Sequence, residues 1–523
     1  MKVVPFLVFK PIVIEVEVHQ QLHAFLREQG EATWPHHLTI ARLVARALRL
    51  QRSALIQVSA SASYQGRYRL SYLASIMLWP GSVMVVVPEP IRQQLLQCEI
   101  PRLSEWMRVE KPLCLGFPDP SFGGAIFVSP QEWLADHLSP QPQLPATIPL
   151  ILDGADALEE WVCDHVTAVL QPHHWDALLW TCPSLAAQIR NLRVALTHAL
   201  FQHPDNPYRC SLIEAPEQEI LIRLHHLLQE HRGFRHCPPW PSFWQQFLDP
   251  ESLKWAEVNR EKGTFSLHAA PVSCSEVFQG LWSQRAVVLL GSHLDSEPDA
   301  TTFRQRVGLE ALTCVQFGAE QQTEAIQLYL PDGLPMPNTP QFQAALVQHL
   351  QRLLLASVSS AHPTILIVDD LPLKGQIATV LASYFGSRVR VETLELRGGN
   401  ILVTGWEFWQ QAQQYIPPPQ LLVIATLPIP SPEDPRVAGR MAYYKRRRQD
   451  WFRLFLLPEA LRTLQRAIAP LRERQGVVAL LDNRVLHRSY GQQVLSALSP
   501  YGRLDYVDET LFQGENLTLV DRA

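Results

Sequence analysis

Lysine is scarce in this chain of 523 residues. It supplies 7 of the 45 basic side chains, and none lies between Lys10 and Lys111. Cysteine is also sparse, and none of the 8 cysteines belongs to a C-x-x-C pair. The spacing therefore predicts no zinc ribbon, redox pair or iron–sulfur quartet. With no recognisable secretory signal, we expect free thiols and a cytoplasmic protein.

Long apolar runs are missing as well. No stretch of about 18 uninterrupted apolar residues occurs, so we expect no membrane span. The opening segment is interrupted by Pro5, Lys10 and Pro11, and residues 14–18 alternate apolar and acidic side chains, which predicts a strand. The formal net charge of −5 excludes a whole-protein polycation but leaves room for a local basic groove.

Short apolar runs separated by helical patterns fill the first part of the chain. They predict strands of a parallel sheet that is buried on both faces, at residues 54–58, 83–87, 124–128 and 149–152. From about 156 to 255 the pattern becomes helical, at residues 162–170, 184–200 and 217–230, with no convincing strand. This stretch is interpreted as a helical insertion.

Strand patterns return in the second half, where a proline-rich loop at 331–340 marks a boundary. Residues 341–356 predict a helix, and further strands are predicted at residues 286–290, 364–368, 401–404, 421–425 and 477–481. We therefore predict an α/β protein with two open parallel sheets and helices inserted into the first unit. The expected boundaries are a first domain over 1–160, an insertion over 161–262, a return to the first domain over 263–335, and a second domain over 336–523.

Three segments of the C-terminal half form an ordered set of motifs: Leu427-Pro428-Ile429-Pro430 with Pro432 and Pro435, Leu457-Pro458-Glu459-Ala460 before Gln465, and Gly476-Val477-Val478 with Asp482, Arg484 and Tyr490-Gly491. Taken in this order, they resemble the DinG/XPD family of superfamily-2 DNA helicases. The resemblance implies two RecA-like domains of the P-loop type, with ATP and Mg²⁺ held between them and single-stranded DNA running across both. Because the interval from Gly66 to Asp153 holds only Cys98 and Cys114, we expect no iron–sulfur cluster.

The segment that stands where the family has its P-loop departs from the pattern. It reads Ser59-Ala60-Ser61-Ala62-Ser63-Tyr64-Gln65-Gly66-Arg67-Tyr68. A P-loop offers backbone N–H groups and a lysine to the phosphates, but here only Gly66 remains as glycine and Arg67 or Tyr68 occupies the lysine position. The planar guanidinium of arginine substitutes poorly for a compact ammonium. By resemblance, Gly66 and Arg67 are the candidate nucleotide-binding residues of this segment.

Two further motifs differ from the family pattern at the residues that carry the chemistry. The family's Asp-Glu-Ala-His appears as Asp153-Gly154-Ala155-Asp156, which retains the Mg²⁺ ligand and catalytic carboxylate at Asp153 but lacks the glutamate. In motif VI, aligning Gln465 with the family glutamine places Arg472 on the second family arginine. By resemblance, Gln465 and Arg472 are candidate nucleotide-binding residues, and Arg472 is also a candidate catalytic residue. Together with the P-loop, these changes predict lost or greatly weakened ATP hydrolysis.

A basic and aromatic stretch is the candidate nucleic-acid contact. Tyr444, Lys445, Arg446, Arg447 and Arg448 combine charge for phosphates with a ring for stacking, as in single-strand binders. A solvated helix face is the alternative interpretation.

We therefore predict a DinG/XPD-like protein that binds single-stranded or branched DNA as a pseudo-helicase or regulatory partner in DNA repair or replication. An active ATP-dependent helicase that uses Arg67, Asp153 and Arg472 remains an alternative. A protein-interaction scaffold with no nucleic-acid role is the third.

Overall fold

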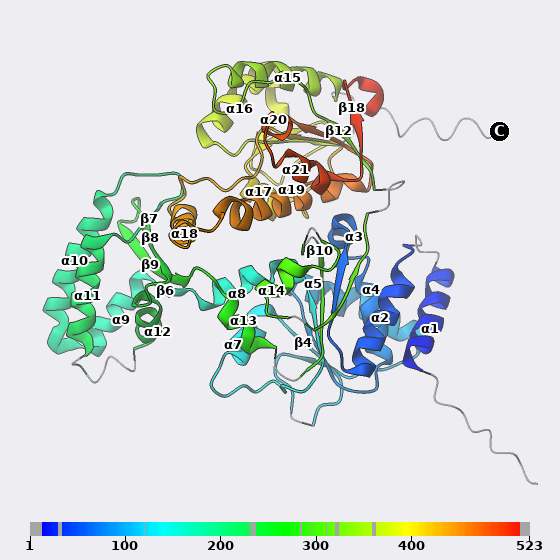
Figure 1. Ribbon diagram of the computed structural model, residues 1–523, viewed down its shortest axis with the longest axis horizontal. Helices are drawn as coiled ribbons and strands as arrows, with labels where there is room; N and C mark the ends of the chain where they lie inside the picture. Colours follow the sequence, from blue (N-terminus) through cyan, green and yellow to red (C-terminus); the bar gives the residue numbers. More distant parts are fainter. Residues whose placement is uncertain are drawn as a thin grey trace, which may run out of the picture.

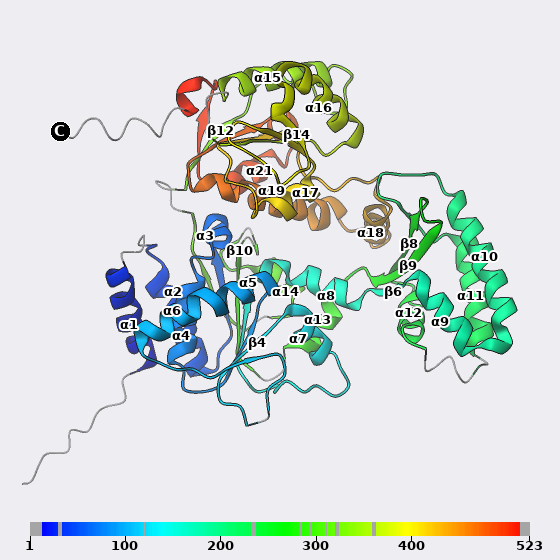
Figure 2. The same ribbon diagram turned by 180° about the vertical axis from the view of Figure 1, so that it is seen from behind.

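The computed structural model describes residues 13–29, 34–119, 121–229, 231, 237–282, 285–292, 294–295, 297–309, 311–319, 324–357 and 362–512. Pro5, Lys10 and Pro11 lie outside these residues. Two α/β domains stand one above the other, and a third unit extends to one side of both (Figures 1 and 2). No described helix has the length and apolar character that crossing a membrane requires.

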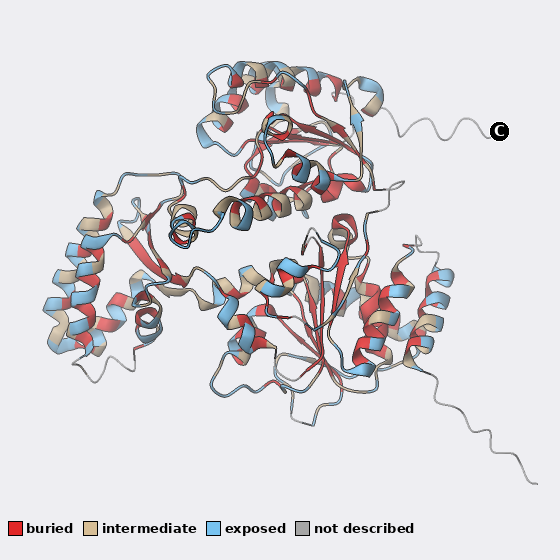
Figure 3. Ribbon diagram, in the orientation of Figure 1, coloured by how far each residue is buried: buried red, intermediate tan, exposed pale blue. Residues whose placement is uncertain are grey.

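The first domain is built on a parallel sheet of seven strands. Their order is β11-β1-β10-β5-β2-β4-β3, with bounds β1 Ala54–Val58, β2 Val83–Val86, β3 Leu113–Leu115, β4 Ala125–Val128, β5 Leu150–Asp153, β10 Val287–Ser292 and β11 Thr313–Gln316. The side chains of β1 are buried on both faces, as a sheet covered by helices on either side requires (Figure 3). The strands predicted from the apolar runs are confirmed here, whereas β3 and β11 carry too few buried residues to be recognised in the sequence.

Helices cover both faces of this sheet. One face carries α1 (Ile14–Gln29), α2 (His37–Leu50), α4 (Arg69–Leu78) and α6 (Ile100–Met107), and the other carries α7 (Pro130–His137), α8 (Leu158–Val166), α13 (Ser275–Leu281) and α14 (Thr301–Arg306). The strand predicted at residues 14–18 is wrong because these residues begin α1. Val18, Leu22, Phe25 and Leu26 recur at helical spacing and are buried, a longer period that outweighs the local alternation.

The unit predicted as a helical insertion contains a sheet as well. Its helices are α9 (Pro172–Thr181), α10 (Ala186–Gln202), α11 (Ala215–Gln229) and α12 (Trp240–Phe247). They pack with an antiparallel sheet in the order β6-β9-β8-β7, formed by β6 Ala168–Leu170, β7 Cys210–Leu212, β8 Ser252–Asn259 and β9 Thr264–Pro271. The prediction that this region has no strand is therefore wrong, because two of its strands are only three residues long and the third mixes polar with apolar positions.

The second domain repeats the parallel architecture. Its strand order is β14-β15-β13-β16-β17-β12-β18, with bounds β12 Ile326–Tyr329, β13 Thr364–Ile367, β14 Val389–Val391, β15 Ile401–Thr404, β16 Leu421–Ile424, β17 Val477–Leu480 and β18 Tyr501–Leu504. Helices α15 (Phe342–Ala356) and α16 (Leu371–Phe385) cover one face, while α17 (Trp406–Ala412), α19 (Leu457–Arg472) and α21 (Gly491–Leu498) cover the other. Strand β12, which lies in the range expected to return to the first domain, pairs with β17 and β18 of the second sheet.

Candidate functional site

The segment that follows β1 forms a helix rather than an open loop. Ser59 caps α3 (Ala60–Gln65) by accepting a hydrogen bond from the Ala62 N–H at 3.2 Å, and the Ser63 N–H donates to the Ser59 carbonyl at 3.0 Å. The Arg67 N–H donates to the Ala62 carbonyl at 3.1 Å. Because these N–H groups already have partners within the segment, they do not form the ring of free donors that holds a phosphate.

Asp153 lies at the carboxyl end of β5, next to this segment, and its side chain is fully buried. Three side chains from the start of α4 surround it. Tyr72 donates its hydroxyl to Asp153 Oδ2 at 2.9 Å, Arg69 Nε donates to the same oxygen at 3.1 Å, and the Tyr68 hydroxyl donates to Oδ1. Both carboxylate oxygens therefore have protein partners, and the negative charge is balanced by an arginine.

The titration of these groups reflects their burial. Burial and the Asp153 charge raise the pKa of both tyrosine hydroxyls well above their ordinary value. Burial alone would lower the pKa of Arg69, but the Asp153 carboxylate more than offsets this and raises it. Arg69 stays a cation and the tyrosines stay protonated donors, so this arrangement is a stable acceptor–donor cluster across the physiological pH range.

Gly66 is the one residue of the segment that has a clear structural requirement for glycine. It caps α3 with a φ of 67°, a left-handed conformation that other residues rarely adopt. A Cβ at this position would also lie 2.3 Å from Nη1 of Arg69. Gly66 therefore permits the approach of the guanidinium that neutralises Asp153.

The residues present do not fit Mg²⁺ and ATP. A magnesium ion needs free carboxylate oxygens, but both oxygens of Asp153 are occupied. A lysine is absent from the described segment, and the planar guanidinium of Arg67 is a poor substitute for its compact ammonium. Gly154, at the glutamate position, has no side chain to orient a water. The Asp153 carboxylate, which was predicted to bind the metal and to act in catalysis, is paired with Arg69.

Arg472, predicted as a catalytic and nucleotide-binding residue, is buried inside the second domain. Its guanidinium donates to four backbone carbonyls, those of Glu324, Leu498, Ser499 and Pro500, at 2.8–3.2 Å. Burial lowers its pKa to about 10. All of these partners belong to the second domain or to the segment that enters it, so Arg472 holds the end of α19 against the loop between α21 and β18.

A different arginine of α19 reaches the first domain. Arg466 Nη2 lies 2.7 Å from Asp156 Oδ2 and donates to the Asp156 carbonyl at 3.2 Å. Asp156 is held close to β10, because a Cβ at Gly291 would lie 2.9 Å from its backbone nitrogen. The ion pair thus joins the two domains at the position where the related motif has histidine.

Helix α3 also contacts the second domain directly. It packs against α19, and the Tyr64 hydroxyl donates to the Gln413 carbonyl at 3.2 Å. A cavity of about 450 Å³ remains beside this contact, and Ser59, Arg306, Gln465 and Arg472 are among the residues that line it. Of the predicted nucleotide-binding residues, Gln465 and Arg472 therefore line the same cavity. Asp153 and Gly66 both lie next to Arg69.

The predicted nucleic-acid residues lie at the carboxyl end of α18 (Pro435–Arg446) and just after it. Lys445, Arg446 and Arg448 are exposed, whereas Tyr444 is half-buried. Arg447 is exposed too, but it pairs with Glu251 Oε2 at 2.5 Å and lies over the Tyr443 ring. The stretch is a basic surface with one of its charges already paired.

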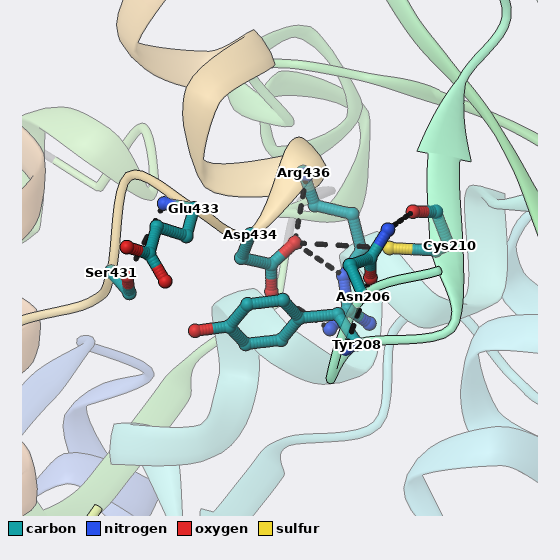
Figure 4. A network of polar contacts seen from close by, with 7 residues as sticks. All are labelled: Asn206, Tyr208, Cys210, Ser431, Glu433, Asp434 and Arg436. Carbon is teal, nitrogen blue, oxygen red and sulfur yellow. Dashed lines mark hydrogen bonds and ion pairs between the residues drawn. The ribbon is translucent and has the colours of Figure 1, made fainter. Parts of the chain in front are cut away.

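The insertion holds α18 in place. Asp434 caps the helix by accepting hydrogen bonds from the Arg436 N–H and Nε, and the Cys210 thiol of β7 lies 4.0 Å from the same oxygen (Figure 4). Farther along the helix, a Cβ at Gly439 would lie 2.2 Å from Leu253 of β8. Helix α18 therefore packs closely on the sheet of the insertion, which fixes the direction of its basic end.

The motifs that carry the resemblance have structural roles of their own. Asp482, after β17, is fully buried and accepts the Leu427 N–H at 2.8 Å, while Arg484 pairs with the same carboxylate. This contact joins the Leu-Pro segment to the Asp-x-Arg signature. Among the described residues, no group of three or more His, Cys, Asp or Glu side chains is arranged to hold a metal ion.

Comparisons with known proteins agree with this architecture. Residues 419–501 match the helicase C-terminal domain family. The chain is 24% identical over 253 residues to "ATP-dependent DNA helicase YoaA" of Escherichia coli (strain K12), and 24% identical over 277 residues to the protein of that name in Haemophilus influenzae. These matches cover 46% and 47% of this chain and 40% of each relative, so the chain matches less than half the length of either.

Two solved structures share the fold. "XPD_Helicase" has a TM-score of 0.58 at 11% identity and covers 90% of this chain and 100% of that chain, and "XPD_APO" has a TM-score of 0.55 at 12% identity and covers 89% and 100%. The two seven-stranded parallel sheets are therefore RecA-like, as predicted. Together with the sequence matches, this confirms the resemblance to the DinG/XPD family of superfamily-2 helicases.

Proposed function

We propose that this chain, a DinG/XPD-like helicase homologue, binds single-stranded or branched nucleic acid without hydrolysing ATP. The observation that carries the proposal is the cluster around Asp153, whose two oxygens accept hydrogen bonds from Tyr68, Arg69 and Tyr72. A carboxylate neutralised in this way is a structural ion pair rather than a metal ligand.

The other requirements of phosphoryl transfer point in the same direction. The N–H groups of the segment that forms α3 donate to acceptors within it, so they do not provide the backbone donors that bind the phosphates of a nucleotide. The nearest alternative carboxylate for orienting water, Asp156, is paired with Arg466. The alternative of an active helicase needs Arg67, Asp153 and Arg472 around one nucleotide, but Arg472 donates to four backbone carbonyls and Asp153 is paired with Arg69.

Nucleic-acid binding is supported by the exposed charges at the end of α18. Lys445, Arg446 and Arg448 have no ion pair within the described residues, and Lys445 lies over the ring of Trp451. Basic groups beside aromatic rings are typical of surfaces that bind single strands. Both relatives are named as DNA helicases, which favours DNA as the ligand.

A fixed arrangement of the two domains suits a regulatory role. Protein groups alone make the contacts of α3 and Asp156 with the second domain, through the Tyr64 hydroxyl and through Arg466. We place the protein in the cytoplasm, where it would act in DNA repair or replication by holding a DNA strand for a protein partner.

Equilibrium binding of a fluorescent single-stranded oligonucleotide, with and without Mg²⁺ and ATP, tests this proposal. We expect the Kd to be the same with and without Mg²⁺ and ATP, and to depend strongly on salt concentration. A Kd that shifts about tenfold with ATP, and whose shift disappears in Asp153→Ala, would contradict it. Absence of any salt-dependent binding would favour the protein-interaction scaffold.

A further inference from the structure

A second basic surface lies at the edge of the second sheet, away from α18. It is a groove of about 590 Å³ formed along edge strand β14 and the loop that leads into β15. Arg388, Arg390 and Arg397 line it, together with the polar side chains of Ser387, Thr393 and Asn400. Neither the related motifs nor the contacts between the domains use these residues.

The charge of this groove is unbalanced. No ion pair involves any of the three arginines within the described part of the chain, and Glu395 is the one acidic residue among those that line the groove. By contrast, the neighbouring Glu392 is paired with Lys374 at 2.5 Å, outside the groove. Three guanidinium groups on one surface repel one another unless an anion lies between them.

The groove has a fixed frame. The Arg397 N–H donates to Asn400 Oδ1 at 2.7 Å and the Asn400 N–H donates back to the Arg397 carbonyl at 3.1 Å, which closes a tight turn. Arg388 Nε donates to the Gly399 carbonyl at 2.8 Å, so it ties the start of β14 to this turn and leaves its two Nη groups for a ligand. The Arg388 guanidinium and the turn at residues 397–400 are therefore held in place before any ligand binds.

Arg388 ends the short 3-10 helix Gly386–Arg388, and Arg390 follows it in β14 (Val389–Val391), so both line the same groove from neighbouring elements. Three arginines that line one elongated groove, with hydroxyl and amide groups beside them, suit a row of phosphates better than a single small anion. No aromatic side chain lines the groove, so it offers nothing on which a base can stack.

We propose that this groove binds the sugar–phosphate backbone of a nucleic-acid strand, without reading its sequence. The proposal rests on the proposed function and extends it to a second contact. Helix α16, which precedes β14, and helix α18 both lie on the side of the second domain that faces the insertion (Figures 1 and 2).

The test compares three variants in salt titrations of oligothymidylate binding. The groove variant R388Q/R390Q/R397Q removes the three arginines, K445Q/R446Q/R448Q removes the charges near α18, and R52Q/R190Q/R223Q removes three exposed arginines elsewhere as a matched change in net charge. We expect the groove variant to reduce the slope of log K against log salt by roughly 2, from ~0.7 per phosphate contact, and the matched control to leave it unchanged.

Each outcome decides between the proposals. If the α18 variant lowers the slope but the groove variant behaves like the matched control, the groove proposal is wrong and the proposed function stands. If the wild type shows no salt-dependent binding, both fail. If the groove variant instead loses binding of polyglutamate while its oligothymidylate slope stays at the wild-type value, the groove takes an acidic protein segment and the proposal is overturned.

Discussion

Arg69 Nε lies 3.1 Å from Asp153 Oδ2 in a position where neither side chain is freely accessible to water. The arginine belongs to the first turn of α4 and the aspartate to the end of β5, so the pair joins the helix after α3 to the neighbouring part of the sheet. In a nucleotide hydrolase of this fold the same aspartate would face a metal ion. Here it contributes to the stability of the first domain.

Removing either partner of this pair should therefore destabilise the first domain. Asp153→Ala leaves a buried guanidinium without a partner, and Arg69→Ala leaves a buried carboxylate, each at a cost of about 3–5 kcal/mol. Hydrogen exchange of peptides covering residues 60–78 measures the loss. R69M/D153N, which removes both charges, serves as the control and should recover most of the protection. Unchanged exchange in Asp153→Ala would show that the pair does not support the fold.

The ion pair between Asp156 and Arg466 should hold the two domains together. We expect Asp156→Arg and Arg466→Asp each to loosen the contact of α3 with α19 and the exchanged pair D156R/R466D to restore it, with a coupling of about 1–3 kcal/mol. Small-angle scattering reports the separation of the domains. Equal scattering by the wild type and both single variants would rule out a role for this pair.

His37 should make the first domain sensitive to acid. Burial, then the charges of Arg67 and His36, lower its pKa from 6.5 to about 4, and its Nδ1 lies 3.1 Å from Ser71 Oγ. In that pH range the unfolded chain binds a proton that the folded chain does not, so stability is lost as the pH falls from 6.5 toward 4, by about 3 kcal/mol. Thermal midpoints measured against pH should fall more steeply in the wild type than in His37→Gln. Parallel profiles would contradict this assignment.

The basic residues near α18 should differ in their effect on nucleic-acid affinity. Arg446→Gln removes an unpaired charge and should weaken oligonucleotide binding and lower the salt slope by ~0.7. Arg447→Gln should cost less affinity, because Arg447 already pairs with Glu251. Fluorescence anisotropy of the two variants side by side provides the comparison. A larger loss in Arg447→Gln would show that the Glu251 pair breaks on binding.

The sheets were largely predictable and the site was not, for different physical reasons. Buried parallel strands such as β1 and β16 are continuous apolar runs, which stand out in any sequence. Strand β14 has only three residues and an exposed pattern, so nothing distinguishes it from a loop. The first five residues of α1 alternate as a strand would. Over all sixteen residues of the element, the buried side chains recur at helical spacing, and the helix forms.

The site depends on contacts between elements that lie far apart in sequence. A linear comparison of motifs identified Asp153 and the missing lysine but pointed to Arg67 and Arg472 as the remaining cations. In the structure, Arg69 pairs with Asp153 and Arg466 pairs with Asp156. The spacing of Tyr68 and Tyr72 was a signal in the sequence for this cluster. Residues four apart lie on the same face of a helix, and both hydroxyls donate to Asp153 at the end of β5.

Release of phosphate from ATP, in the presence of Mg²⁺ and saturating single-stranded DNA, is the most direct test of the claim that Asp153 is a structural residue. We predict that the wild type and Asp153→Ala release phosphate at the same rate, indistinguishable from a reaction without protein. A DNA-stimulated rate in the wild type that is lost in Asp153→Ala, with the variant still folded by circular dichroism, would contradict it.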